Sequence, residues 1–448
     1  MNADIVLKNA SLMLPGGQQV EADLAICDGR VAAWANQIDV AAREEIDVNG
    51  SAVIPGIIDP HVHLGIFGDL RTEAATESRS GLASGITTIG CYVGGPNPHL
   101  TSIPAWRETV SDELYTDCFV HPVIGTERQL NEMPQAVERL GVRSFKVYMT
   151  GIPGLLDSVD DGFLLDVFRS SANCPIPPRI CIHAENPQII ERATARLGAQ
   201  VTSQYGTLLD WENTHPGVCE AEAVTRALFL AEMMETLVYF VHVSSHETVA
   251  VLRGRKPVYA AAETTSPYLT LTANERDGVL GKMVPPLRQP EDQSALWSAI
   301  EAGVIDTIGT DNTTLTRAEK GVDQSVWKAM PGYPVLGTHL PALIEEGVHQ
   351  RNLPLAKLVP LLTEAPARIF GLYPRKGALL PGSDADVVVL DLDHPRRVRA
   401  EDLGSRSDFS LYDGRSLRGW PRLVIKGGRV VVRDAVLDPA AKGTGKLL

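Results

Sequence analysis

Two histidines separated by one residue, His61 and His63, follow directly on a short apolar run of the sequence. In a β-strand, side chains two positions apart point to the same face, so we expect these imidazoles to project together. Neutral imidazole is the most common nitrogen ligand for zinc-like metals. A His-x-His pair alone is more typical of two histidines in an ordinary turn, so the metal-binding interpretation depends on what else the chain supplies.

Four more metal-capable or ionisable side chains lie within or directly after other short apolar runs. They are Lys146, His183, His242 and Asp311. Taken singly, each has an ordinary explanation: a lysine whose amine reaches solvent, a hydrogen-bonded core histidine, or an aspartate that caps a helix. A lysine flanked by apolar residues in a strand is nevertheless costly unless it has a role. The recurrence at several runs favours one shared site.

These six side chains match the needs of two divalent metal ions. The two sets are His61, His63 and Asp311 for one ion, and His183 and His242 for the other. Lys146 can bridge them only if its neutral amine adds carbon dioxide and becomes an anionic carbamate, and burial favours the neutral amine. Two ions roughly 3.5–4 Å apart can hold a bridging hydroxide at neutral pH. We expect this hydroxide to be the nucleophile, and Asp311 to be the general base and acid that passes its proton to the leaving nitrogen.

The elements that must position these residues alternate along the middle of the chain. Eight short apolar or β-branched runs are separated by longer mixed segments, with helix-like stretches at 73–83 and 220–235. Such runs suit strands buried on both faces of a parallel sheet, and eight β-then-α units favour an α/β fold, a closed (β/α)8 TIM barrel. The runs are 53–59, 86–93, 118–124, 144–149, 179–184, 237–243, 257–263 and 305–310. The six candidates then belong to strands one, four, five, six and eight, at the carboxyl end where active sites of this fold lie.

The two ends of the chain differ from this middle. They hold short strand-like pieces at 5–8, 23–34, 385–392 and 423–432, with turns rich in Gly and Pro and no helical segment between them. Each end is too small to bury much alone, and chain termini often lie close together, so we expect one small β-sandwich built from both. The predicted organisation is a discontinuous β-sandwich domain of residues 1–52 and 375–448 and a metal-dependent barrel domain of residues 53–374.

The composition excludes several classes of partner. The formal net charge is −14, whereas nucleic acids and anionic membranes favour an excess of Lys and Arg. No apolar stretch approaches the length of a transmembrane helix, and the first residues lack the basic and apolar regions of a signal peptide. The six cysteines form no C-x-x-C pair and are typical of reduced thiols. We therefore expect a cytoplasmic protein whose partner is a small molecule rather than nucleic acid or membrane.

The pattern as a whole resembles the amidohydrolase superfamily, and within it the hydantoinases, dihydropyrimidinases, allantoinases and dihydroorotases. The matching pieces lie at 53–63, 144–146, 183–186, 242–245, 285–288 and 382–387, so the resemblance covers nearly the whole chain. It implies metal ligands at the same six residues with the bridging carbamate on Lys146, zinc as the usual metal, and a homo-oligomer, either a dimer or a tetramer. The implied reaction is the hydrolytic opening of a cyclic amide, imide or ureide, of the hydantoinase or dihydropyrimidinase kind, with an allantoinase or dihydroorotase as the alternative.

Four positions depart from the patterns of these enzymes. Gly65 stands where dihydroorotases usually carry Arg, and Gly151 stands where hydantoinases and dihydropyrimidinases carry a Tyr that donates to the developing oxyanion. Asn312 follows the metal-binding aspartate in place of a frequent His, and Val284 precedes the Pro-Pro-Leu-Arg stretch in place of Ser or Asn. The metal set is intact and the substrate-recognition set is altered, so we expect an unusual ring, and weak turnover of dihydrouracil and plain hydantoin.

Other residues are candidates for contacts with the substrate. Tyr148 and Thr150 share the face of Lys146 by the two-residue period of a strand, and either could supply the donor missing at Gly151. Barrel filling explains Tyr148 equally well. Arg288, which ends the Pro-Pro-Leu-Arg stretch, and Asn312, which follows the metal-binding aspartate, complete the candidate set.

Two other classes of function fit parts of the pattern. A Schiff-base aldolase on a similar barrel would use Lys146 and need no metal, but it leaves the four histidines unexplained. A catalytically inactive relative acting as a binding protein would be expected to have lost metal ligands, and none is missing here. Metal content separates these alternatives, because only the hydrolase is expected to hold about two ions per chain.

Overall fold

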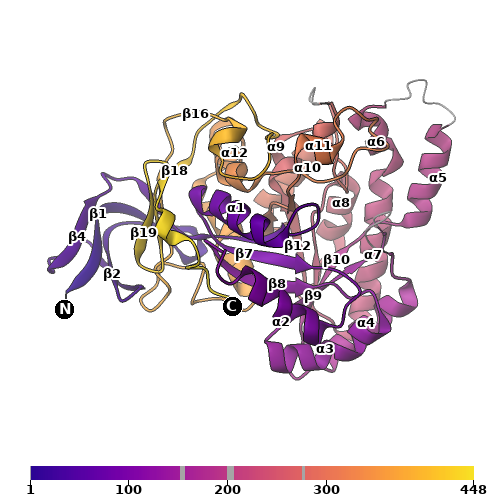
Figure 1. Ribbon diagram of the computed structural model, residues 1–448, viewed down its shortest axis with the longest axis horizontal. Helices are drawn as coiled ribbons and strands as arrows, with labels where there is room; N and C mark the ends of the chain where they lie inside the picture. The colour runs from indigo at the N-terminus through magenta and orange to yellow at the C-terminus, as the bar shows by residue number, and fades with distance from the viewer. Residues whose placement is uncertain (1, 152–156, 199–205, 275–277) are drawn as a thin grey trace.

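The computed structural model describes residues 2–151, 157–198, 206–274 and 278–448. Figure 1 shows a barrel of strands surrounded by helices, with a sheet built from the indigo and yellow ends of the chain on one side of it. This arrangement confirms the predicted α/β class, the (β/α)8 barrel and the joining of both termini into one β-rich unit. The boundaries proposed at 52/53 and 374/375 stay a prediction.

Parallel strands close the barrel in chain order. Hydrogen bonds link them as two sheets, β14-β6-β7-β8 and β9-β10-β11-β12-β13. A bridge between Val123 and Lys146 joins β8 to β9, with the amide of Ile124 donating to the carbonyl of Lys146 at 2.8 Å. The strands are β6 (Ile57–His63), β7 (Ile86–Val93), β8 (Asp117–Pro122), β9 (Ser144–Tyr148), β10 (Arg179–His183), β11 (Val238–Phe240), β12 (Ala260–Thr265), and β13 (Thr307–Gly309) followed by β14 (Asn312–Thr313). The eighth strand is thus interrupted at Thr310 and Asp311.

Helices cover the barrel and begin at side chains that cap them. Asp69, Thr126, Asp160 and Ser245 each accept a hydrogen bond from the amide three residues later, which satisfies a donor that the first helical turn leaves free. The helices are α1 (Leu70–Ala83), α2 (His99–Val110), α3 (Glu127–Leu140), α4 (Asp161–Ala172), α5 (Pro187–Gly198), α6 (Leu208–Thr214), α7 (Gly217–Met234), α8 (His246–Arg255), α9 (Ser266–Thr270), α10 (Pro290–Glu301), α11 (Arg317–Lys320), α12 (His339–Leu343), α13 (Leu355–Leu362) and α14 (Glu364–Ile369). Within the described ranges, none of these helices is long and apolar enough to cross a bilayer.

The terminal strands form one nine-stranded sheet. Its members are β1 (Ala3–Leu14), β2 (Gln18–Cys27), β3 (Arg30–Ala35), β4 (Ala42–Asp47), β5 (Ala52–Pro55), β15 (Val387–Asp391), β18 (Trp420–Lys426), β19 (Arg429–Arg433) and β20 (Val436–Leu437). Alternation along β15 divides its side chains between two cores. Val387 and Val389 pack with β1 and β2 inside the terminal domain, whereas Val388 and Leu390 join the large core shared with the barrel.

The first predicted run, residues 53–59, is divided between the two parts of the molecule. Its beginning is β5, which pairs with β1 and β15 of the terminal sheet, and its end is β6 of the barrel. Gly56 lies at the division, where a Cβ atom would stand 2.2 Å from Thr87 Oγ1 and 2.8 Å from Asp386 Cβ. The two parts therefore approach each other more closely at this point than any side chain would permit.

Buried ion pairs also join the terminal sheet to the barrel. The Lys376 ammonium bonds to the carboxylate of Asp386 at 2.6 Å and to that of Asp117, the first residue of β8. Lys426, the last residue of β18, lies 2.7 Å from the same Asp117 carboxylate. All four side chains are almost completely enclosed. Opposite charges thus compensate each other where the terminal sheet contacts the barrel, as buried charges require.

Candidate metal centre

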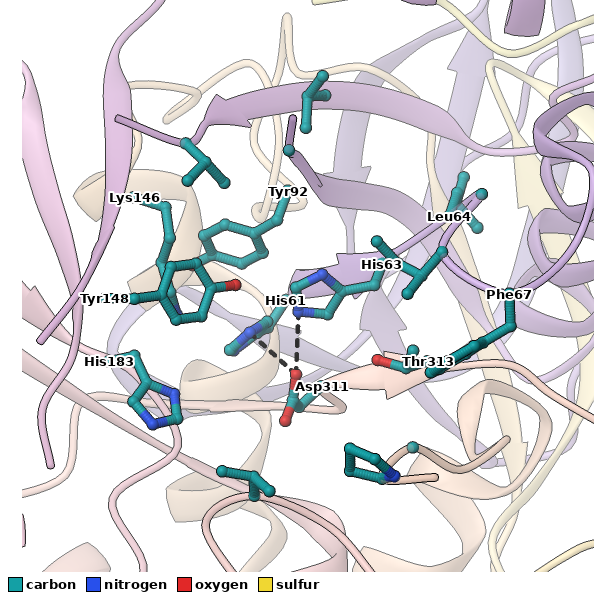
Figure 2. A pocket seen from close by; sticks show the side chains of 18 of the residues that line it. His61, His63, Leu64, Phe67, Tyr92, Lys146, Tyr148, His183, Asp311 and Thr313 are labelled. Atoms are coloured by element: carbon teal, nitrogen blue, oxygen red, sulfur yellow. Dashed lines mark ion pairs between the residues drawn. The ribbon is translucent and has the colours of Figure 1, made fainter. Parts of the chain in front are cut away.

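His61 and His63 converge on one carboxylate oxygen at the carboxyl end of the barrel. Both belong to β6, and their Nε2 atoms lie 3.1 and 3.2 Å from Oδ1 of Asp311 (Figure 2). Asp311 sits at the interruption of the eighth strand with a φ of 54°, a conformation that is strained for a residue other than glycine. The backbone is held in this conformation where it turns the carboxylate towards the two imidazoles.

Glu263, on β12, orients His61 through its Nδ1 atom. Its Oε1 lies 2.6 Å from Nδ1 of His61, and its Oε2 accepts a hydrogen bond of 2.7 Å from Tyr239. Burial lowers the pKa of His61, but the charges of Glu263 and Asp311 outweigh it and raise that pKa to about 9. Glu263 was not among the candidate site residues predicted from the sequence. Its signal was available, because a carboxylate at the end of a buried apolar run is as unusual as the histidines at the ends of the other runs.

Asp59, on β6, links that strand to the residues between β13 and β14 by hydrogen bonds. One carboxylate oxygen accepts from the amides of His61 and Thr310 at 3.1 and 3.0 Å, and the other accepts from the Thr310 hydroxyl at 2.6 Å. Burial raises the pKa of Asp59 to about 7. The contacts fix the spacing between the strands that carry His61 and Asp311.

Lys146 lies on the opposite wall of the site, on β9. Its amine is fully buried and has no hydrogen-bond partner among the described residues. It lies 4.7 Å from the ring centre of Tyr92 and 4.8 Å from that of Tyr148. Burial lowers the pKa of Lys146 to about 8, in spite of the nearby charge of Asp311. A lysine in these surroundings is readily available as the neutral amine.

The remaining two histidines complete the ring of donors. The rings of His183 and His242 pack edge to face with centres 4.5 Å apart, and His242 lies 5.5 Å from His61. Nε2 of His183 is paired with Glu185 at 2.9 Å, which leaves Nδ1 to face another partner. His242, like Asp311, has a positive φ, of 42°. Backbone strain thus recurs at two of the six candidates.

All six candidates line a single cavity of about 360 Å³. Figure 2 shows Lys146, Tyr148 and His183 on one side of it and His61, His63 and Asp311 facing them. Leu64 and Phe67 lie on the His63 side of the cavity (Figure 2). The apolar side chains of the lining include Leu64, Ile66, Phe67, Leu70, Trp106, Met283, Val284 and Pro331.

The four candidates for substrate contacts have different surroundings. Tyr148 lines the cavity, and its hydroxyl points towards the histidines of β6 (Figure 2). Thr150 and Arg288 are buried outside the described lining; Arg288 donates to the hydroxyl of Ser244 at 3.0 Å and to the carbonyl of His215. Asn312 is also buried outside the lining, and its side-chain oxygen accepts from the amides of Val335 and Leu336 at 2.8 and 3.2 Å.

The donors present fit divalent metal ions. The imidazole nitrogens of His61 and His63 and an oxygen of Asp311 lie within 4.8 Å of one another, which is the spacing of three ligands on one ion. The amine of Lys146 is buried without a hydrogen-bond partner among the described residues, and Nε2 of His61 has only the ion-pair contact of 3.1 Å with Asp311. Buried polar atoms are normally hydrogen-bonded, so an unpaired amine beside this cluster of imidazoles and a carboxylate is consistent with a site built to hold metal ions.

Comparison with known proteins gives concordant results. The model of the family described as "Amidohydrolase family" matches residues 179–431. The chain is 34% identical to an L-hydantoinase of Paenarthrobacter aurescens, over 96% of this chain and 94% of that protein. It is 32% identical to an allantoinase of Rubrobacter xylanophilus, over 96% of both. The solved structure of L-hydantoinase (dihydropyrimidinase) from Arthrobacter aurescens matches with a TM-score of 0.91 at 32% identity, covering 99% of each chain.

Proposed function

Because this chain belongs to the amidohydrolase family, in the group that includes hydantoinases and allantoinases, we propose that it hydrolyses a carbon–nitrogen bond of a cyclic amide, imide or ureide. The observation that carries the proposal is the gathering of His61, His63, Lys146, His183, His242 and Asp311 around one cavity at the carboxyl end of the barrel. That end is where enzymes of this fold place their catalytic residues.

The six residues would hold two divalent ions, with zinc as the metal that the resemblance implies. His61, His63 and Asp311 form one set, and His183 and His242 form the other. Lys146 lines the same cavity, and its neutral amine would attack carbon dioxide, form a nitrogen–carbon bond and release a proton to give a carbamate with two oxygens that could bridge the two sets. When bound, the ions would lower the pKa of a water molecule and polarise the ring carbonyl.

Asp311 is placed to move the proton of the reaction. Its Oδ1 faces the two histidines of β6, and its carboxylate lines the cavity in which the ring must bind. A carboxylate at this place would accept a proton from the attacking water and deliver it to the nitrogen that leaves the carbonyl carbon. Glu263 and Glu185 serve this chemistry indirectly, because each fixes one nitrogen of a ligand histidine and so decides which nitrogen faces the cavity.

Tyr148 is the donor that we propose for the ring carbonyl, in place of the tyrosine absent at Gly151. Its hydroxyl reaches the cavity and makes no hydrogen bond to the described residues, so it is free to bind the substrate. Burial raises the pKa of Tyr148, so the hydroxyl stays protonated at neutral pH. Thr150 was the other candidate from the sequence, but it lies outside the described lining of the cavity.

The apolar wall of the cavity favours a ring with an apolar substituent. Its described lining contains no arginine, and its charged side chains are limited to Lys146, Asp311 and the histidines. A ring that carries a second carboxylate, such as dihydroorotate, would find no cation there beyond the metal set. A substituted hydantoin or imide would instead bury its substituent against Ile66, Phe67 and Trp106, at a gain of about 25 cal/mol per Å² of apolar surface.

Metal analysis and a substrate panel test the proposal together. Mass spectrometry of the purified protein should give about two divalent ions per chain. Steady-state kinetics should then rank 5-benzylhydantoin and a substituted succinimide above dihydrouracil, hydantoin, allantoin and dihydroorotate. Metal-free protein that borohydride traps on its substrate would support an aldolase. The highest kcat/KM for dihydrouracil would contradict the proposed substituent site.

The location and assembly follow from the composition and the resemblance alone. We propose a cytoplasmic enzyme that forms a homodimer or a homotetramer. Sedimentation velocity at micromolar concentration distinguishes the two, and a monomer in that experiment would contradict the proposal.

A further inference from the structure

Tyr333 reaches the same carboxylate as the two histidines, but from the other side. It lies in the segment that follows α11, is buried and lines the cavity. Its hydroxyl donates to Oδ2 of Asp311 at 3.3 Å, whereas Oδ1 faces His61 and His63. The two oxygens of one carboxylate therefore have different partners.

The backbone around Tyr333 is anchored on both sides. The amide of Thr313, two residues after Asp311, donates to the Tyr333 carbonyl at 3.1 Å. Before Tyr333, the fully buried amine of Lys320 donates to the carbonyls of Gly332 and Lys282, both at 2.6 Å. A lysine enclosed without a carboxylate is rare, and here its two hydrogen bonds hold the segments of Lys282 and Gly332 together.

Asn312 anchors the segment after Tyr333. Its side-chain oxygen binds the amides of Val335 and Leu336, and its own amide donates to the Thr310 hydroxyl at 3.0 Å. Asn312 therefore ties the 333–336 segment to the strand that carries Asp311. Asn312, which stands where this enzyme group often has a histidine, therefore helps to place Tyr333 opposite Asp311.

We propose that Tyr333 is the positioning residue of Asp311, holding Oδ2 in the orientation that proton transfer needs. The torsion that rotates an aspartate carboxylate is broad, so a carboxylate without a second partner turns easily. Oδ2 has two lone pairs, and one hydrogen bond from Tyr333 leaves the other directed at the cavity. The inference rests on the proposed role of Asp311 in hydrolysis. Tyr148 has a different task, because its hydroxyl has no partner among the described residues and faces the cavity.

The first test is Tyr333→Phe, assayed with 5-benzylhydantoin on the zinc-loaded enzyme. A hydrogen bond to a charged group that acts only in the chemical step should lower kcat by about 10- to 100-fold and leave KM and zinc content unchanged. Tyr268→Phe is the matched control: Tyr268 is equally buried, but its hydroxyl donates to the carbonyl of Pro285 at 2.6 Å. That variant should keep the kcat of the wild type even if its melting temperature falls.

A double variant tests whether Tyr333 acts through Asp311. In an Asp311→Asn background, Tyr333→Phe should cause no further loss, because the group that it positions is gone. If the kcat losses of the two single variants multiply in the double variant, the inference is overturned. It is also overturned if Tyr333→Phe keeps the wild-type kcat while Asp311→Asn is impaired. A fully active Asp311→Asn variant would instead contradict the proposed function itself.

Crystal structures provide a readout that needs no substrate. Zinc-loaded wild-type protein should show one orientation of the Asp311 carboxylate with Oδ2 bound to Tyr333. The Tyr333→Phe protein should show that carboxylate rotated or in two orientations. An identical single orientation in both proteins would refute the positioning role.

Discussion

Glu263 gives a prediction that separates charge from geometry in the metal site. Three donors meet its carboxylate: His61 Nδ1 at 2.6 Å and the His242 amide at 3.3 Å on Oε1, and the Tyr239 hydroxyl at 2.7 Å on Oε2. Glu263→Gln can keep its amide oxygen at the Oε1 position. The new NH2 group then faces Tyr239, whose hydroxyl can accept that hydrogen bond and donate to Thr307 at 2.6 Å instead. Glutamine therefore removes the charge and keeps the hydrogen bonds.

The expected magnitudes differ between two substitutions of Glu263. Partners of a ligand histidine typically contribute 10- to 100-fold to metal affinity. Glu263→Gln should lie near the lower limit, with zinc binding weakened about 10-fold. Glu263→Ala leaves the Nδ1–H of His61 unpaired in a fully buried place, so it should weaken zinc binding about 100-fold and lower the free energy of unfolding by about 1–3 kcal/mol.

Competition with a chromophoric chelator measures the zinc affinity, and thermal unfolding of the metal-free proteins measures the effect on the fold. Glu77→Gln is the matched control, because Glu77 is fully buried and accepts hydrogen bonds from Ser405 and the amide of Arg406, away from the described cavity lining. It should bind zinc like the wild type. Wild-type zinc affinity in both Glu263 variants would show that His61 is no ligand or that Glu263 does not orient it.

Three further substitutions test the other proposed roles. Lys146→Ala should abolish activity and lower the metal content, with partial rescue by short carboxylic acids and bicarbonate; a fully active variant would exclude the bridging carbamate. Asp311→Asn should keep the fold by circular dichroism and cut turnover by roughly 10²–10⁴-fold, the range of a general acid–base group, whereas near-native turnover would mean that the proton takes another route. Tyr148→Phe should reduce kcat on 5-benzylhydantoin by about 10²–10³-fold as an oxyanion donor is lost, and an unchanged kcat would leave barrel filling as the role of Tyr148.

The strands of the barrel were predictable because burial on both faces leaves a continuous apolar signal. The run at 86–93 coincides with β7, and the run at 144–149 ends one residue beyond β9. The same continuity hid the division at Gly56, because residues on both sides of it are apolar and buried, although they belong to different sheets. The pairing of β5 with the terminal sheet and the close approach of Thr87 and Asp386 to Gly56 reveal the boundary.

The candidate site was predictable to the extent that its residues lie at strand ends. The six ligand candidates lie within or shortly after barrel strands, and the structure brings them to one cavity. Tyr333 could not be found in this way, because it lies in an irregular segment whose path depends on hydrogen bonds to Lys320 and Asn312. Arg288 was a candidate because its motif is conspicuous in the sequence, but the structure does not place it at the cavity. Its guanidinium donates to Ser244 and His215 outside the described lining.

The nine-stranded terminal sheet has a consequence for how the chain emerges from the ribosome. β1 and β2 are synthesised first, but β15 and β18, with which they share a core, follow more than 300 residues later. Until then, β5 lacks the partner strand β15 and keeps an open edge, the kind of surface on which chains aggregate. The carboxylate of Asp117, at the start of β8, likewise lacks its ion-pair partners Lys376 and Lys426 until they are synthesised. The barrel strands are therefore synthesised before the terminal sheet is complete. Nascent chains of this protein are expected to depend on chaperones until the last strands of that sheet arrive.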